Sequence, residues 1–291
     1  MPATLPLSFR IAARTARPAA IAFLAACLGW PLGAAHAQGS STAGASSVGD
    51  WRYSASVYGY LPSIGGSSSF PTGTGSTMDV SGSKILDALK FTFMGTFDAH
   101  NGRWGAFTDF IYLDLGDTKR GTRDFTVGGR AVPGSVSADL SWDLKGVLWT
   151  LGGQYRLVSD PKLTVDALAG VRLLSLKPSL SWSVDGDLGT IAATGRTGSS
   201  ELSETLWDGI VGAKGRYALG ESGKWSLPFY VDVGTGESQL TWQAAAGLSY
   251  AFSWGELTGM WRYISYDMKS DSGPIKDLSF NGPMLGATFR W

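Results

Sequence analysis

The sequence has few of the residues that carry most enzyme chemistry. Among its 291 residues are one cysteine and two histidines, and 24 basic side chains are matched by 24 acidic ones. A single cysteine forms no internal disulfide, so a disulfide framework is excluded. The lack of a basic excess argues against nucleic-acid binding. Beyond the N-terminus, no apolar run reaches the roughly 20 residues that a membrane-spanning helix needs.

The N-terminus has the composition of an export signal. Three arginines and no acidic residue precede an apolar segment, residues 19–34. Ala35-His36-Ala37 follows this segment and has the small-x-small pattern of a cleavage site. We therefore expect residues 1–37 to be removed, which leaves 21 basic and 24 acidic side chains. Leu24-Ala25-Ala26-Cys27 resembles a lipobox, but the apolar run continues past Cys27 and favours an ordinary signal. The next segment, residues 38–50, is rich in Gly, Ser and Ala and predicts a flexible leader.

Abundant glycine (40 residues) and tryptophan (12 residues) accompany short segments in which apolar and polar side chains alternate. The clearest example is residues 239–267. Leu240, Trp242 and Leu248 share one face with other apolar residues, while Gln243 and Ser249 lie on the opposite face. A period of two predicts a pair of strands with one apolar and one polar face.

The remainder parses into ten such strands. The turns after the second, fourth, sixth and eighth strands are short, and the connections after the odd-numbered strands are mostly longer. The expected strands are residues 51–61, 89–99, 103–115, 138–157, 163–176, 206–219, 225–233, 239–252, 256–267 and 279–291, and the expected long connections are 62–88, 116–137, 177–205, 234–238 and 268–278.

An even number of amphipathic strands with short turns at one end and long loops at the other is typical of a transmembrane barrel. We therefore expect an all-β fold: a single antiparallel, up-and-down transmembrane β-barrel of about ten strands over residues 51–291. Pro228 and Pro283 each remove a backbone donor, so eight or twelve strands remain alternatives. Asn101-Gly102 predicts a two-residue hairpin turn, and an apparent change of face predicts a bulge within residues 147–152.

The aromatic residues distinguish a membrane barrel from a soluble sandwich, which would bury its apolar face against a second sheet. Tryptophans lie at the turn ends of strands, and further Trp and Tyr residues lie towards the loop ends, as in two interfacial girdles. The expected girdle residues are Trp51, Trp104, Trp225 and Trp291 at the turn ends and Tyr112, Trp142, Trp207 and Tyr263 towards the loop ends.

The signal, the ten amphipathic segments and the ending Phe289-Arg290-Trp291 together resemble Gram-negative outer-membrane β-barrel proteins of the broad OmpA-like and OmpW-like class. The resemblance implies an outer-membrane location, contact with membrane lipid and lipopolysaccharide, and recognition of Phe289 and Trp291 by the barrel-assembly machinery. Members of the class usually end in Phe, so Trp291 is a departure. The resemblance carries no activity.

Enzymes of this kind typically use a histidine near the extracellular side, whereas the only histidine expected after cleavage, His100, precedes a short turn. A paired-carboxylate site remains an alternative, because Asp109, Asp114 and Asp117 end the third strand and Asp139 and Asp143 begin the fourth. Ordinary charge at a barrel mouth explains the same residues, and we expect no metal or cofactor.

The polar faces of the strands predict the lining of the lumen. Eight basic and seven acidic side chains nearly balance, whereas a selective pore would more naturally show one sign in excess. At about ten strands we expect a mostly plugged lumen in which the charges pair, with a narrow solute path as the alternative. The candidate lumen residues are Arg52, Lys90, Lys145, Arg172, Lys214, Arg216, Arg262 and Arg290, and Asp98, Asp109, Asp143, Asp166, Asp208, Asp232 and Glu256.

Two outer connections add candidate features. Residues 83–90 predict a short helix capped by Ser83, which either folds over the mouth or begins the second strand. The connection 116–137 contains four basic residues that suit lipopolysaccharide phosphates or simply face solvent. The expected function is a non-enzymatic, porin-like or structural barrel. The alternatives are a hydrolase that uses the loop-end carboxylates and an adhesin that binds through residues 62–88 and 177–205. The oligomeric state is left open.

Overall fold

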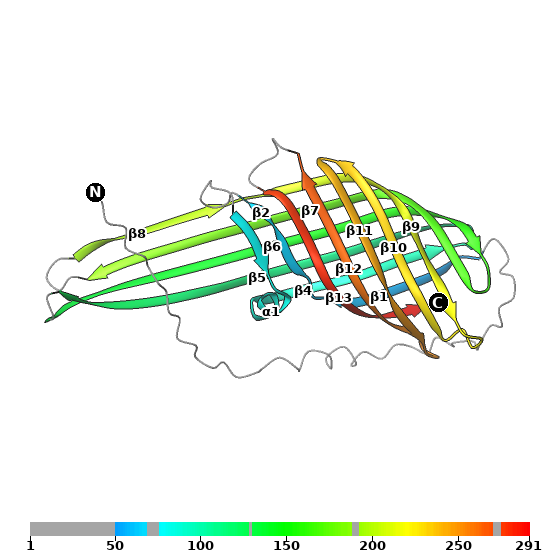
Figure 1. The fold of residues 1–291 in the computed structure, drawn as a ribbon, viewed down its shortest axis with the longest axis horizontal. Coiled ribbons are helices and arrows are strands. Elements are labelled where there is room, and N and C mark those ends of the chain that lie inside the picture. The colour runs from blue at the N-terminus through cyan, green and yellow to red at the C-terminus, as the bar shows by residue number, and fades with distance from the viewer. Residues whose placement is uncertain (1–49, 69–75, 128–129, 188–191, 270–274) are drawn as a thin grey trace, which may run out of the picture. The chain divides into compact units, whose positions relative to one another are not determined.

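The computed structural model describes residues 50–68, 76–127, 130–187, 192–269 and 275–291 (Figure 1). The predicted signal and nearly all of the predicted leader lie outside these residues, and both stay predictions. All of the described residues belong to one compact unit, Thr42–Trp291. Among the described residues, no helix is long and apolar enough to cross a membrane.

Ten strands in the described part of the chain form a closed antiparallel ring, which confirms the predicted fold class. Each strand pairs with its predecessor and successor in the ring, and β1 pairs with β13 to close it (Figure 1). The ring strands are β1 (Arg52–Tyr60), β4 (Leu89–His100), β5 (Trp104–Val127), β6 (Arg130–Ser159), β7 (Leu163–Asp187), β9 (Glu204–Leu219), β10 (Trp225–Gly236), β11 (Ser238–Ala251), β12 (Glu256–Met268) and β13 (Ile275–Arg290).

Three further strands and a short helix belong to segments that we expected to be connections. β2 (Ser63–Ser68) continues the course of β1 along β13 and also pairs with β3 (Ser76–Val80). β8 (Ala192–Glu201) continues the course of β9 along β7. The helix α1 (Gly82–Asp87) lies between β3 and β4.

The predicted connection 116–137 is wrong as a loop, because β5 and β6 stay paired through most of it. Likewise, β7 and β8 pair through much of 177–205. The four strands β5 to β8 therefore continue as a sheet beyond the level at which β4 and β9 begin. In β5, residues 116–124 are polar or glycine at both odd and even positions, so this stretch has no alternating pattern and has the composition of a loop.

Three local predictions also need correction. The helix begins one residue before the predicted 83, with Ser81 rather than Ser83 at its N-cap position. The central residues of the first hairpin turn are Gly102 and Arg103, because the backbone N–H of Asn101 donates to the carbonyl oxygen of Trp104 at 2.9 Å. Gly102 has φ +89°, which suits a turn that needs a glycine first. No bulge occurs within 147–152; the register of β6 against β7 shifts after Arg156 instead.

The two faces of each ring strand differ as the alternation requires. On β11, the side chains of Leu240, Trp242 and Leu248 are exposed on the outside, whereas Thr241 and Gln243 are buried in the interior. A closed ring leaves no sheet edge within the hydrocarbon layer, and an outer surface of exposed apolar residues suits lipid. The hydrophobic core lies inside the ring, towards the loop ends of the strands.

Candidate functional site: the barrel lumen

The loop-side half of the lumen is filled with apolar side chains. They come from nearly all of the ring strands and from β2 and α1, whose Ile85 is only 2% exposed. A void of only about 50 Å³ remains among them. The buried members of this apolar layer are Tyr58, Tyr60, Ile64, Ile85, Ala88, Met94, Ile111, Leu115, Leu148, Leu174, Leu176, Leu206, Ile264, Tyr266, Met268, Ile275 and Leu278.

The helix α1 is fixed at the mouth of the ring by close backbone approaches. A side chain at Gly82 would meet the carbonyl oxygen of Leu61 at 3.3 Å, so a glycine allows the helix to begin against the end of β1. After the helix, the backbone N–H of Gly116 on β5 donates to the carbonyl oxygen of Ala88 at 2.9 Å. These contacts place Ile85 in the apolar layer.

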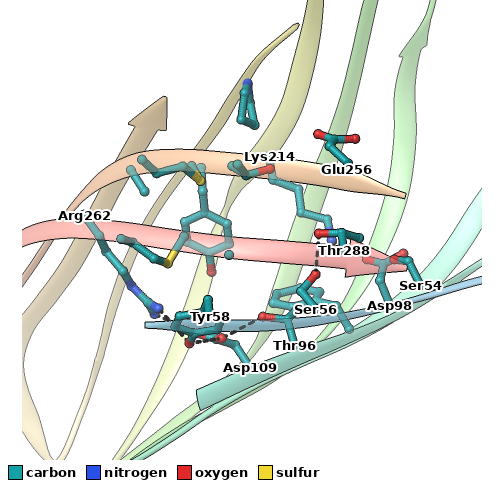
Figure 2. A pocket seen from close by; sticks show the side chains of 18 of the residues that line it. Ser54, Ser56, Tyr58, Thr96, Asp98, Asp109, Lys214, Glu256, Arg262 and Thr288 are labelled. Carbon is teal, nitrogen blue, oxygen red and sulfur yellow. Dashed lines mark hydrogen bonds and ion pairs between the residues drawn. The ribbon is translucent and has the colours of Figure 1, made fainter. Parts of the chain in front are cut away.

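Below the apolar layer lies a buried charge network (Figure 2). Asp109 accepts hydrogen bonds from Tyr58 (2.6 Å) and Thr96 (2.9 Å), and its other oxygen lies 2.7 Å from a guanidinium nitrogen of Arg262. The amide oxygen of Gln243 accepts a hydrogen bond from Arg262 at 3.1 Å. Three further side chains, Tyr58, Thr96 and Gln243, thus hold one buried carboxylate and its arginine.

A second arginine extends the network across the lumen. The side chains of Arg172 and Asp232 form an ion pair with no solvent exposure. Arg172 also donates to the amide oxygen of Gln243 at 3.1 Å, so Gln243 joins the two arginines. Charges buried this deeply are tolerated only when they are paired and hydrogen bonded. The network fixes side chains from seven strands in one arrangement.

On the turn side of the network is a polar cavity of about 330 Å³ (Figure 2). Lys214 pairs with Asp98 at 2.5 Å, and Glu256 pairs with Arg216 at 2.9 Å and also with Arg290. The side chain of Arg290 is 48% exposed, against 4% for that of Arg262 at the floor. The cavity therefore opens at the turn end of the barrel and ends at the charge network. Hydroxyl groups also line it, from Ser54, Ser56, Thr96, Thr258 and Thr288.

The structure brings most of the predicted lumen charges together on the inner face. Arg52 is the outermost of them, exposed at the turn end and in register with His100. The interior members are Asp98, Asp109, Asp166, Arg172, Asp208, Lys214, Arg216, Asp232, Glu256, Arg262 and Arg290.

Three predicted lumen residues lie on the outer face instead: Lys90, Asp143 and Lys145. On β6, Leu144 packs against the inner apolar layer, so its neighbours Asp143 and Lys145 point outwards. The predicted bulge in β6 would have turned them inwards, and it is absent. Lys90 lies at a register shift in β4 and forms an ion pair with Asp143 on the outer face.

The candidate carboxylates for an acid/base site lie on opposite faces of the barrel wall. Asp109 lies inside the ring and is held by Arg262. Asp114 and Asp143 lie on the outer face, because their neighbours Leu115 and Leu144 belong to the interior. Asp114 and Asp143 line the same outer cavity, and the barrel wall separates both of them from Asp109.

Sequence reasoning missed two polar side chains of the interior. Arg156 pairs with Asp166 and lies two residues after the inward-facing Gln154, a spacing that would have identified it. His100 is 9% exposed, and its Nε2 atom lies 3.5 Å from Asp166, so it is an interior residue rather than a simple turn residue.

The predicted girdle residues lie on the outer surface with one exception. Trp142 packs against the interior apolar layer, again because β6 keeps its alternation. Several outer aromatics stack in pairs, such as Trp242 and Tyr263, with ring centroids 4.7 Å apart. Among the predicted girdle residues, Trp51, Trp104, Trp207, Trp225 and Trp291 are exposed, and Tyr112 and Tyr263 are partly exposed. A closed ring with this apolar, aromatic surface is an outer-membrane barrel.

Comparisons with known proteins find similar chains among solved structures alone. No family model matches the chain, and no curated protein matches it. Among solved structures, it is similar to the translocator domain of the autotransporter NalP from Neisseria meningitidis, at 18% identity and TM-score 0.34 over 83% of this chain and 88% of that one. The outer membrane protease OmpT from Escherichia coli matches at 9% identity and TM-score 0.43, over 83% and 97%. Ail, the attachment invasion locus protein of Yersinia pestis, matches at 12% identity and TM-score 0.31, over 83% of this chain and 98% of that one. These likenesses concern the fold alone.

Proposed function

We propose that this outer-membrane barrel is a non-enzymatic structural protein whose lumen does not conduct. The observation that carries the proposal is the double closure of the interior, by an apolar layer and by a network of paired charges. An ion that entered the turn-side cavity would have to break the network and then cross apolar side chains, with the loss of its hydration at each step. The cavity is therefore a blind vestibule.

The proposed partners are the lipids around the barrel, including lipopolysaccharide, and the barrel-assembly machinery. Trp291 exchanges two backbone hydrogen bonds with Tyr53 of β1, at 2.9 and 3.0 Å, so the C-terminal residue takes part in the closing seam of the ring. Phe289 is exposed on the outer face of the same strand. A terminal strand with exposed aromatics at the seam suits recognition during assembly.

Conductance in planar lipid bilayers tests the closed lumen. Native protein should give no discrete openings at any protein load. A matched variant removes residues 63–87 and joins the flanks through Gly-Gly, which is feasible because β1 and β4 are antiparallel neighbours. This variant lacks Ile64 and Ile85 of the apolar layer and should open more often than native protein. Unitary openings in the native protein would contradict the proposal. Slower gel migration after boiling serves as the folding check for both proteins.

One observation favours a second candidate, a surface-binding protein. The sheet of β5 to β8 continues beyond the ring and presents polar strands on the loop side. Replacement of residues 119–137 by a two-residue turn should leave the ring folded, because the ring pairs of β5 and β6 lie between Trp104 and Leu115. Weaker adhesion of cells that display this variant, compared with cells that display native protein, would support the candidate. Unchanged adhesion would count against it.

A further inference from the structure

A polar cluster interrupts the outer surface of the barrel at one height. Lys145 on β6 is in register with Asp114 on β5 and with Lys177 on β7. The residues next to these lysines, Leu144 and Leu176, pack inside the ring, so both lysines point outwards. Lys145 and Lys177 are exposed and lie directly opposite each other on neighbouring strands.

The cluster lies immediately beyond the apolar outer band. Each strand has its next outward-facing residue two positions closer to the turn end. These residues are Tyr112 on β5, Val147 on β6 and Ser175 on β7. The next outward row on β6 and β7 contains Trp149 and Leu173. A change from apolar and aromatic to charged residues marks the boundary between hydrocarbon and lipid headgroups. The lysines therefore lie at the height of the outer-leaflet headgroups.

One of the three lysines of the cluster forms an ion pair among the described residues. Lys90 forms an ion pair with Asp143. Within the part of the chain that the structure describes, neither Lys145 nor Lys177 forms an ion pair. Like charges opposite each other on neighbouring strands destabilise a sheet, so an anion between these lysines would relieve their repulsion.

The cluster also borders a cavity and contains a hydrogen-bond acceptor that lacks a donor. The lysines border a cavity of about 750 Å³ that is also lined by Asp114, Ser179 and Glu201. The Oδ1 atom of Asp114 is buried and has no hydrogen-bond partner among the described residues. A buried carboxylate oxygen without a donor is costly. A ligand with hydroxyl or amide donors beside its anionic group would satisfy both features.

We propose that this cluster binds the phosphorylated sugar headgroup of an outer-leaflet lipid. Lys145 and Lys177 hold the phosphate, and Asp114 accepts a hydrogen bond from a hydroxyl or amide of the sugar. A simple phosphodiester lipid headgroup would supply the charge but not the sugar hydroxyl or amide that donates to Asp114. The inference rests on the proposed contact with lipopolysaccharide and is independent of whether the lumen conducts.

The test is lipid retention by the full mature chain, measured by native mass spectrometry from phosphatidylethanolamine nanodiscs that contain diphosphoryl lipid A. The double variant Lys145→Gln/Lys177→Gln should retain roughly tenfold less lipid A, since each charge-assisted hydrogen bond contributes strongly. Asp114→Asn should retain less than native protein as well. The control is Lys162→Gln/Lys224→Gln, which removes the same charge from exposed lysines at the turn ends.

Two outcomes would overturn the proposal: equal retention by native protein and Lys145→Gln/Lys177→Gln, or an equal loss in the control, which would show general charge attraction. Displacement of lipid A by millimolar inorganic phosphate alone would identify a free-anion site instead. Native protein and all three variants should show the same gel shift on boiling and the same bilayer conductance. Channel openings in the native protein would therefore refute the closed lumen and leave the lipid A retention result unaffected.

Discussion

On the loop side of the lumen, apolar side chains fill the space between strands; on the turn side, pairs of opposite charges border a cavity. Both halves are built from the inner faces of the same strands. The apolar half gains stability from each side chain that it buries, whereas the charged half gains little net stability from each pair and a great deal of geometric constraint. Substitutions in the two halves should therefore lower the stability of the barrel for different physical reasons.

The largest expected effect comes from breaking one buried pair. Arg262→Met leaves Asp109 buried without its cation and should lower the free energy of unfolding by about 3–5 kcal/mol. Urea titration of the barrel in lipid vesicles measures the change. The double variant Arg262→Met/Asp109→Asn is the control and should recover much of the loss, because Tyr58 and Thr96 still bond the amide. A double variant no more stable than Arg262→Met would contradict a charge-pairing origin.

A cavity in the apolar half should cost somewhat less. Ile264 has no exposed surface, and Ile264→Ala should lower the free energy of unfolding by about 2–5 kcal/mol, through lost burial and the cavity left behind. The same titration measures it. Leu285→Ala on the lipid face, where the native side chain is 67% exposed, is the matched control and should cost clearly less. Equal losses would mean that the interior of this half is not tightly packed.

The smallest expected effect lies at the turn-side rim. Arg290→Gln removes a half-exposed cation whose partner, Glu256, keeps Arg216 at 2.9 Å. The free energy of unfolding should fall by only about 0–1 kcal/mol, as for other solvent-accessible ion pairs. A loss comparable to that of Arg262→Met would show that the cavity is closed to water, which would remove the distinction between the two halves.

Sequence reasoning located the ring strands because lipid outside and a filled lumen inside impose a strict period of two. It failed where that constraint ends. In β5, residues after Leu115 have polar side chains on both faces, so paired strand and loop have the same pattern. In β6, Gly146, Gly152 and Gly153 carry no side chain that marks the inner or the outer face. The sequence therefore predicts a bulge where the alternation is unbroken.

The residues of the charge network were predictable, but their partners were not. Periodicity assigns Asp109, Arg172 and Arg262 to the inner face, where each is found. Which cation meets which anion depends on the stagger of strands that are distant in sequence: Asp109 and Arg262 lie 153 residues apart. Composition showed that the charges balance, and only the closed ring shows how they pair.

The length of the β5–β6 hairpin has a consequence for what lies outside the cell. From Gly116 to Val127, β5 continues in pairing with β6 past the headgroup row, and at about 3.3 Å per residue this stretch measures roughly 36 Å along the strand. Even with the usual strand tilt, the hairpin extends well beyond the level at which β4 and β9 begin. An antibody raised against residues 116–127 should therefore label intact bacteria, and the absence of labelling would contradict this placement.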